Sequence, residues 1–198
     1  MIKAVIIDLW ETIATKSFSV SIRLMEQFNI KKTSDFLERY EKALQLKKWR
    51  NKKEMAENFF MCFDIHINYN NRTFIIQTVN EGINRAKVFK GMKEILVLLK
   101  KKYKLGILSN TTNFESNIIS LLNFNTFFDV QLYSWQINSL KPSRRSFEEI
   151  CKRLQLNSNE CLFIDNEDRS INKAKKLGFN TIKFKNVEQL KKELLQYY

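Results

Sequence analysis

The sequence has few of the residues on which several common kinds of site depend. It contains 3 Cys, 1 His, 4 Gly and 1 Pro in 198 residues. The cysteines, Cys62, Cys151 and Cys161, form no CxxC pair, which excludes a zinc site built from Cys and His. A Cys-His or Ser-His catalytic pair is excluded unless His66 takes part. We expect the cysteines to be buried as small hydrophobic side chains and His66 to pack between apolar neighbours.

Long hydrophobic runs are also missing. The longest, such as residues 95–99, are far too short to span a bilayer. Asp8 interrupts the apolar run at the N-terminus, and no small-residue cleavage site follows it, so this run is not a signal peptide. We therefore expect a cytoplasmic protein without a membrane partner. Hydrophobic residues at 44% and charged residues at 28% are values of globular proteins and exclude wholesale disorder.

Basic residues outnumber acidic ones. The chain has 34 Lys and Arg against 21 Asp and Glu, a net charge of +13. Such a balance is compatible with nucleic acid or anionic substrates as partners. The lysines are spread along the chain, however, and Lys, Asn, Ile and Phe are all abundant, which favours genome-wide codon bias as the cause. We expect no nucleic-acid partner, and no sequence feature specifies an oligomeric state.

From residue 88 onward, strand and helix patterns alternate. The predicted strands are 104–109, 130–134, 161–165 and 180–184, and the predicted helices are 90–103, 114–122, 143–154, 170–177 and 187–198. Residues 3–8 form a further buried strand, which ends at Asp8. Strands separated by helices of this length predict a parallel sheet with helices on both faces. The fold class is therefore α/β, with a Rossmann-like core.

Residues 17–87 differ from the rest of the chain. Their apolar residues follow helical spacing, which predicts three to five helices and no strand. Because the strand before them belongs to the sheet, the helical segment is an insertion. We therefore predict a core domain of residues 1–14 and 88–198, with an all-helical cap subdomain of residues 15–87.

Polar residues stand where the predicted strands end. In a parallel sheet, ligands bind at the carboxyl ends of the strands. Asp8 ends the first strand, Ser109 ends the second, Lys141 lies in the loop after the third, and Asp165 ends the fourth. Two carboxylates, a hydroxyl and a lysine are thus expected to converge on one crevice.

These motifs, in this order, resemble the haloacid dehalogenase superfamily, in the branch with a helical cap after the first motif. The first family motif, DxDxT after a strand, is matched by Asp8 and Thr12, and the second, a strand ending in Ser or Thr, by Ser109. The remaining matches are Lys141, Pro142 and Phe147 for the third motif and Asp165, Ala174 and Gly178 for the fourth. The resemblance covers nearly the whole chain, although the cap is matched only by position and helicity.

The resemblance implies Mg²⁺-dependent hydrolysis of a small phosphorylated metabolite through an aspartyl-phosphate at Asp8. Lys141 would bridge this nucleophile and the phosphate, and charge pairing would keep Asp8 ionised. Carboxylate and carbonyl oxygens suit Mg²⁺. The implied residues are Asp8, Thr12, Ser109 and Lys141 for catalysis, Ser109, Asn110 and Lys141 for substrate binding, and Asp8, Asp165 and the Trp10 backbone carbonyl for the metal.

Three positions depart from the family pattern. Trp10 stands where the phosphatases carry a second Asp, which protonates the leaving group; its loss could cost about 10²–10⁴-fold in rate. Glu11 replaces the usual glycine, and we expect it to point to solvent. The helix-side acid of the fourth motif falls at Ser170, with Glu167 and Asp168 nearby, so we expect no further support of the metal from that position.

Two alternative functions follow from these departures. The true dehalogenases use no metal and have an aromatic residue at the position of Trp10, a Ser-Asn pair like Ser109-Asn110, and a cap arginine about as far along as Arg39. Asp165 counts against this alternative, since it would repel the carboxylate of a haloacid, and we expect Arg39 to be solvated. The second alternative is a phosphate-binding or interaction protein whose catalysis has decayed because of Trp10.

Overall fold

The centre of the molecule is a five-stranded parallel sheet with the strand order β5-β4-β1-β6-β7. The structure is a computed structural model that describes residues 1–197. The strands are β1 (Ala4–Ile7), β4 (Lys104–Ser109), β5 (Val130–Tyr133), β6 (Cys161–Asp165) and β7 (Asn180–Lys183). β1 is buried along its whole length, because a central strand covered on both faces needs apolar residues at every position. The predicted α/β class is confirmed.

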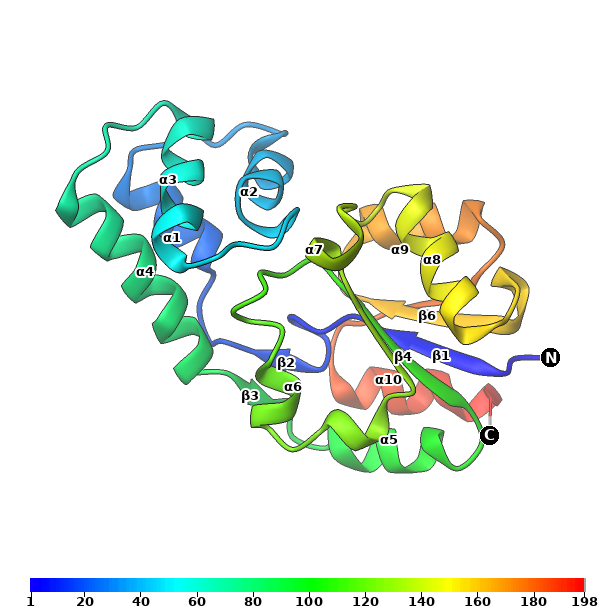
Figure 1. Cartoon of the computed structure of the whole chain (residues 1–198). Helices are drawn as coiled ribbons and strands as arrows, with labels where there is room; N and C mark the ends of the chain where they lie inside the picture. Colours follow the sequence, from blue (N-terminus) through cyan, green and yellow to red (C-terminus); the bar gives the residue numbers. More distant parts are fainter. Residues whose placement is uncertain (198) are drawn as a thin grey trace.

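Helices cover both faces of this sheet (Figure 1). One face is covered by α5 (Met92–Lys100), α6 (Ile118–Leu121) and α10 (Val187–Leu194), which pack against Val5 and Ile7. The other is covered by α8 (Arg144–Leu154) and α9 (Asp168–Lys176), which pack against Ala4 and Ile6. Gly178, just after α9, has a φ of +86°, a conformation that favours glycine at the end of a helix.

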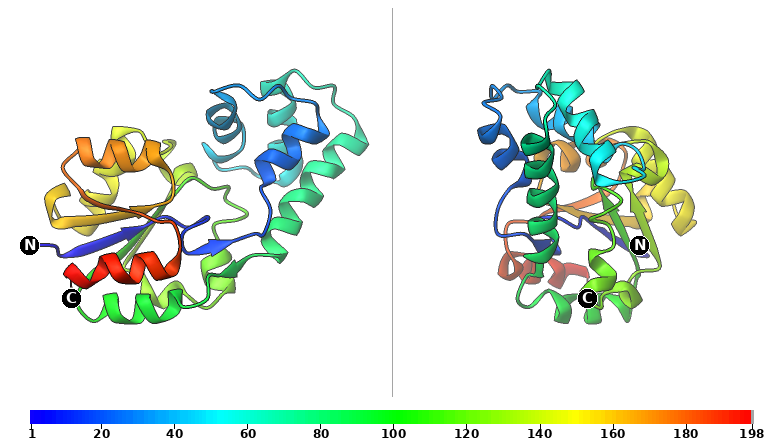
Figure 2. Two further views of the ribbon diagram at one scale, coloured as in Figure 1. Left: turned by 180° about the vertical axis from the view of Figure 1, so that it is seen from behind. Right: turned by 60° about the vertical axis from the view of Figure 1, so that its left-hand side comes forward.

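Four helices form a separate group between β1 and α5 (Figures 1 and 2). They are α1 (Val20–Gln27), α2 (Phe36–Gln45), α3 (Lys52–Phe63) and α4 (Tyr69–Asn84), and we call them the helical unit. Their buried side chains, among them Trp49, Phe59 and Phe60, form a cluster of their own. The number of helices lies within the predicted range of three to five.

A short antiparallel ribbon joins the two chain segments that lead into and out of the helical unit. β2 (Ala14–Thr15) pairs with β3 (Lys87–Val88). Neither strand was predicted, because two residues are too few to produce an alternating pattern. The remaining elements are α7 (Ser134–Ile137), η1 (Asn125–Phe127), η2 (Ser158–Glu160) and η3 (Leu195–Tyr197).

Some predicted elements and environments were wrong. The predicted helix 114–122 is reduced to α6, and the predicted helix 187–198 divides into α10 and η3, with residue 198 outside the described chain. Cys62 and His66 are exposed and Cys151 is half-buried; only Cys161 has the predicted burial. Cys62 lies on α3, whose buried face is formed by other residues, and His66 follows the end of that helix. Over residues 1–197, no helix has both the length and the apolar character needed to cross a membrane.

Candidate active site

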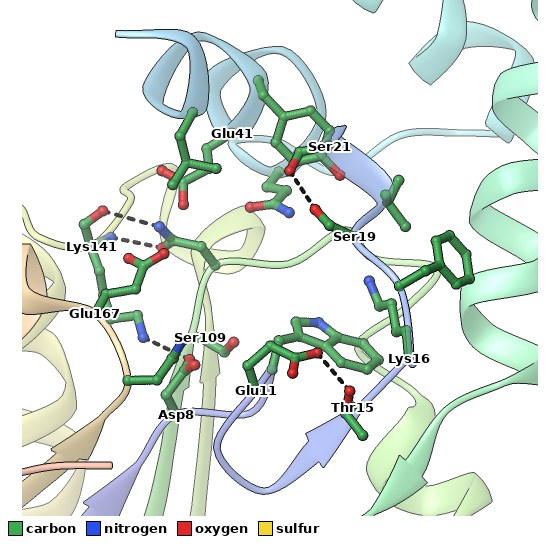
Figure 3. A pocket seen from close by; sticks show the side chains of 18 of the residues that line it. Asp8, Glu11, Thr15, Lys16, Ser19, Ser21, Glu41, Ser109, Lys141 and Glu167 are labelled. Atoms are coloured by element: carbon green, nitrogen blue, oxygen red, sulfur yellow. Dashed lines mark hydrogen bonds and ion pairs between the residues drawn. The ribbon is translucent and has the colours of Figure 1, made fainter. Parts of the chain in front are cut away.

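The carboxyl ends of three neighbouring strands bring the predicted polar residues together. Asp8 follows β1, Ser109 ends β4 and Asp165 ends β6, and β1 lies between the other two strands in parallel register. Asp8, Ser109, Asn110 and Lys141 line a cavity of about 520 Å³ (Figure 3). Asp8, Ser109 and Lys141 therefore meet at one cavity as expected, whereas Asp165 does not line it and joins the group through its contact with Lys141.

Lys141 lies between the two carboxylates. Its Nζ donates to Asp8 Oδ1 and to Asp165 Oδ2, at 2.6 Å in each case. All three side chains are buried, with exposed fractions of 4% for Lys141, 8% for Asp8 and 0% for Asp165. At this burial the attraction is screened little by solvent, so the ammonium fixes both carboxylates in position.

Burial and charge shift the titration of this cluster in opposite directions. Burial raises the pKa of Asp8 to about 7; Lys141 opposes the rise, and the negative charge of Asp165 adds to it. Burial alone would lower the pKa of Lys141, but Asp165 and Asp8 outweigh it and raise this pKa above its ordinary value. With both carboxylates ionised, one ammonium balances only half of their charge. The cluster therefore favours an additional cation.

Asn110 fixes the loop that carries Lys141. Its Oδ1 accepts from the Lys141 backbone N–H at 2.7 Å, and its Nδ2 donates to the Lys141 carbonyl at 3.0 Å. Ser109, beside it, has a buried Oγ that makes no hydrogen bond within the described chain. A buried hydroxyl without a partner loses hydrogen-bond energy, and a ligand oxygen in the cavity would restore it.

Thr12 connects two loops of the site rather than lining the cavity. It is fully buried, and its Oγ1 donates to Asn166 Oδ1 at 3.3 Å. Asp165 is held from the same loop, since its Oδ1 accepts from the Glu167 backbone N–H at 2.7 Å. The contacts of Thr12 thus indicate a positioning role for the loop after β1.

The indole N–H of Trp10 is engaged by a residue of the loop after β4. Its Nε1 donates to Thr111 Oγ1 at 3.0 Å, and the Nζ of Lys16 lies 3.9 Å from its ring centroid. Lys16 also pairs with the buried carboxylate of Glu115. An indole provides no carboxyl proton, so position 10 does not supply the general acid that its place in the motif would imply.

Glu11 and Arg39 are both exposed, as expected. Glu11 lies at the cavity edge, where its Oε1 accepts from Thr15 Oγ1 at 2.8 Å. Arg39 lies outside the lining of the cavity, and it donates to the Cys62 carbonyl at 2.9 Å. The solvated interpretation of Arg39 therefore describes its position correctly.

The acids near the start of α9 are engaged on the protein surface. Glu167 pairs with Arg169 at 2.8 Å, and Asp168 pairs with Lys183 at 2.5 Å. Ser170 is fully buried, and its Oγ has no hydrogen-bond partner in the described chain. Of this group, only Glu167 lines the cavity.

α2 supplies a wall of the cavity that the sequence did not predict. Tyr40, Glu41 and Gln45 line it, and Glu41 also pairs with Arg169 of α9. Burial raises the pKa of Glu41, although Arg169 and the Asn110 amide oppose this rise. The four-residue spacing of Glu41 and Gln45 places both on one side of the helix, but it does not show that this side meets the core.

Comparison with known proteins agrees with these strand-end motifs. The model of the haloacid dehalogenase-like hydrolases matches residues 5–184. The chain belongs to this family. A curated relative, the D-ribitol-5-phosphate phosphatase of Bacteroides thetaiotaomicron, is 29% identical over an alignment of 103 residues, and the match covers 48% of this chain and 50% of the relative. The chain thus spans about half the length of the curated relative it matches.

Solved structures of haloacid dehalogenase-like hydrolases have the same fold over nearly their whole length. A predicted hydrolase of the family from Porphyromonas gingivalis has a TM-score of 0.69 at 21% identity, covering 99% of this chain and 98% of the other. A family enzyme of Bacteroides thetaiotaomicron, solved with magnesium and inorganic phosphate, has a TM-score of 0.69 at 18% identity, covering 94% and 96%. A phosphatase of the family from Thermococcus onnurineus has a TM-score of 0.64 at 19% identity, covering 98% of each chain.

Proposed function

We propose that this hydrolase cleaves small phosphate monoesters through a covalent aspartyl-phosphate at Asp8. The observation that carries the proposal is the buried Lys141, which lies 2.6 Å from both Asp8 and Asp165 at the edge of the cavity. The unpartnered hydroxyl of Ser109 lines the same cavity. A nucleophile, a cation and a hydrogen-bond donor are thus assembled where a phosphoryl group would bind.

Each of these residues has a defined task in the proposed reaction. Asp8 attacks the phosphorus atom, so that an Asp8 oxygen–phosphorus bond forms and the bond to the leaving oxygen breaks. Lys141 opposes the rise that burial causes in the pKa of Asp8 and attracts the phosphate, while Ser109 donates to a phosphoryl oxygen. Water then cleaves the aspartyl-phosphate and regenerates Asp8. Because Trp10 supplies no proton, substrates with acidic leaving groups should react faster.

The donor set fits Mg²⁺. Asp8 and Asp165 provide two carboxylates, and the backbone carbonyl of Trp10 is the third ligand that the family pattern implies. Among residues 1–197, no group of three or more His, Cys, Asp or Glu side chains could hold a metal. Mg²⁺ needs no such group, since it is usually held by one or two carboxylates, substrate phosphate and water. When bound, it would neutralise charge on the nucleophile and the phosphate.

We further propose that residues 15–87 act as a cap on a core of residues 1–14 and 88–198. Two contacts join the helical unit to the loops at the strand ends. Ser134 Oγ donates to the Gln45 carbonyl at 2.6 Å, and the Asn113 side chain bonds both backbone polar groups of Trp49, at 2.9 and 3.2 Å. The substrate would therefore be enclosed between α2 and the carboxyl-terminal ends of the strands β1, β4 and β6. We call these strand ends, with the residues that follow them, the sheet edge.

Dehalogenation without a metal is the alternative within the family, and the structure offers it less support. A haloacid carries a carboxylate, and Arg39, which would have to receive it, lies outside the cavity lining. Glu41 lines the cavity and would repel such a substrate. A phosphate-binding protein without turnover is the remaining alternative, and the observation in its favour is Trp10.

A screen of p-nitrophenyl phosphate, acetyl phosphate, alkyl phosphates and 2-haloacids tests these functions. Each compound is assayed with Mg²⁺ and with a chelator. The proposal expects phosphate release with Mg²⁺, and loss of that release with the chelator. Halide release that survives the chelator would establish dehalogenation instead. Phosphate binding without release from any ester would favour the non-catalytic alternative.

A further inference from the structure

Two polar side chains of α2 are buried in the wall of the cavity that faces the sheet edge. Glu41 is 5% exposed and Gln45 is 7% exposed, and both line the cavity. They are four residues apart and so lie on the same side of the helix. Figure 3 shows Glu41 on the side of the cavity opposite Asp8, with Ser109 and Lys141 nearer to Asp8.

Both side chains contain an acceptor oxygen without a hydrogen-bond partner in the described chain. Glu41 uses Oε1 to accept from Arg169, and the Asn110 amide also lowers the pKa of Glu41, but Oε2 makes no hydrogen bond of ordinary length and angle. Gln45 Oε1 is also unpartnered. A buried acceptor that has lost water and gained no donor is unfavourable, and native structures contain few of them. Two such acceptors in one cavity wall indicate a ligand that brings donors.

The cations near this wall are already paired. Lys16 and Lys141 are the basic residues among those that line the cavity. Lys16 pairs with the buried side chain of Glu115. Lys141 pairs with the carboxylates of Asp8 and Asp165. A substrate that carried a carboxylate as well as a phosphate would find no free cation for it.

Arg169 does not change this conclusion. It lies behind the wall between two carboxylates, Glu41 and Glu167, to which it donates from different nitrogens. One guanidinium therefore faces two negative charges, and this part of the wall keeps a net negative charge. Such a wall accepts neutral donors and repels anions.

Neutral polar groups also line the cavity. Ser19 and Ser21 line it, and their hydroxyl oxygens lie 2.9 Å apart. Hydroxyl groups can both donate and accept, so they complement ligand hydroxyls better than a point charge. The cavity, at about 520 Å³, is within the usual range for small-molecule sites and has room for more than a phosphate group.

We propose that Glu41 and Gln45 bind hydroxyl groups of the leaving alcohol, so that the substrates are phosphate monoesters of neutral polyhydroxylated compounds, such as sugar or polyol phosphates. This inference rests on the proposed phosphohydrolase function and assigns its substrate class. Phosphorylated carboxylic acids are disfavoured by the same two residues.

The test compares alkyl phosphates with one another, so that the missing general acid at Trp10 affects all of them alike. D-ribitol 5-phosphate, 2-phosphoglycolate and phosphoethanolamine are assayed with Mg²⁺, and p-nitrophenyl phosphate is included as a measure of phosphohydrolysis itself. We expect kcat/KM for ribitol 5-phosphate to exceed that for phosphoglycolate by about tenfold or more, the scale set by unpaired buried polar groups. Preference for phosphoethanolamine would overturn the proposal in favour of a cationic ligand.

Two variants separate charge from hydrogen bonding. Glu41→Gln removes the charge and should reduce the ribitol-to-phosphoglycolate ratio about tenfold. Gln45→Leu removes an acceptor without changing charge, and should lower kcat/KM for ribitol 5-phosphate but not raise that for phosphoglycolate. Glu38→Gln is the matched control, because Glu38 lies on the same helix, is 57% exposed and pairs with Lys42; it should leave the ratio unchanged.

Binding measurements distinguish failure of this inference from failure of the proposed function. The Asp8→Asn variant is titrated calorimetrically with ribitol 5-phosphate and with phosphoglycolate, with and without Glu41→Gln. Mg²⁺-dependent hydrolysis of p-nitrophenyl phosphate together with equal affinity for the two ligands would overturn the subsite and leave phosphohydrolysis standing. Selective binding of ribitol 5-phosphate without hydrolysis of any ester would support the subsite and contradict the proposed function.

Discussion

The charged groups and side-chain amides of the two cavity walls differ in how fully contacts within the chain satisfy them. At the sheet edge, Lys141 contacts both Asp8 and Asp165, so the charged groups are held by contacts within the chain. On α2, Glu41 and Gln45 each have an acceptor without a partner. Groups that carry out chemistry must be oriented before the substrate arrives, whereas groups that recognise it gain their partners only on binding. Under the proposed function, this contrast would place the chemistry at the sheet edge and substrate selection on the helix.

Replacing the proposed nucleophile is the strongest test of whether the sheet edge carries out the chemistry. Asp8→Asn should lower kcat for p-nitrophenyl phosphate by about 10³-fold or more, because the amide is a far weaker nucleophile than the carboxylate. The near-isosteric change should leave the fold intact, which circular dichroism would check. Asp168→Asn is the control, since Asp168 is 71% exposed and pairs with Lys183 on the surface. Retention of most activity by Asp8→Asn would refute covalent catalysis at this residue.

Removing the central cation tests whether the sheet edge depends on it for stability. Lys141→Met leaves two buried carboxylates without their shared partner, and should lower the free energy of unfolding in metal-free buffer by about 3–5 kcal/mol. Urea denaturation monitored by fluorescence measures the change. Lys183→Met is the control, because an exposed pair contributes only about 0–1 kcal/mol. Equal losses in the two variants would mean that Lys141 does not hold the edge together.

The sheet edge could be predicted from the sequence because local signals determine it. A buried strand needs an unbroken apolar run, as in β1, and the polar residue that ends such a run marks the strand end. Asp8, Ser109 and Asp165 stand at such ends, and parallel topology then brings them together. Gly178 marked the end of α9 in the same way, through a backbone conformation that favours glycine.

The α2 wall could not be predicted, because nothing local specifies which side of an inserted helix meets the core. Glu41 and Gln45 resemble ordinary surface residues of a mixed helix, and Arg169, the partner of Glu41, is 128 residues away in the sequence. The predicted helix 114–122 was too long for a related reason. Thr112 and Asn113 are engaged in loop contacts with Glu115 and Trp49, which place the start of α6 later in the chain.

Placing an acid at position 10 should increase the rate of catalysis at the sheet edge. Trp10→Asp should raise turnover of alkyl phosphates relative to aryl phosphates by about 10²-fold, at the low end of general acid catalysis. Trp10→Asn is the matched control, since it leaves a similar cavity and frees Thr111 equally but supplies no proton. The measurement is kcat/KM with Mg²⁺ for one aryl and one alkyl ester. An equal gain in both variants would show that loss of the indole, and not the acid, caused it.

The smallest effect is expected on the stability of the α2 wall. Burial raises the pKa of Glu41 in the folded protein, with Glu167 adding to the rise and Arg169 and Asn110 opposing it. An acid whose folded pKa is raised binds its proton more tightly when folded, so its ionisation weakens folding as the pH rises through and above the ordinary range for glutamate. Glu41→Gln should therefore be more stable than wild type by about 1 kcal/mol near pH 7, the scale of a typical substitution, and this difference should vanish at low pH.

Thermal and urea unfolding between about pH 4 and 8 measure this difference. Glu38→Gln is the control and should show no pH-dependent gain. If Glu41→Gln keeps its stability but loses selectivity among substrates, the buried charge of Glu41 serves recognition and not folding. The unpartnered oxygen of Glu41 is consistent with that role. A variant less stable than wild type at pH 7 would instead make the ion pair with Arg169 the reason for Glu41. The α2 wall would then resemble the sheet edge, with its charge held by contacts within the chain, and the contrast between the two walls would rest on Gln45 alone.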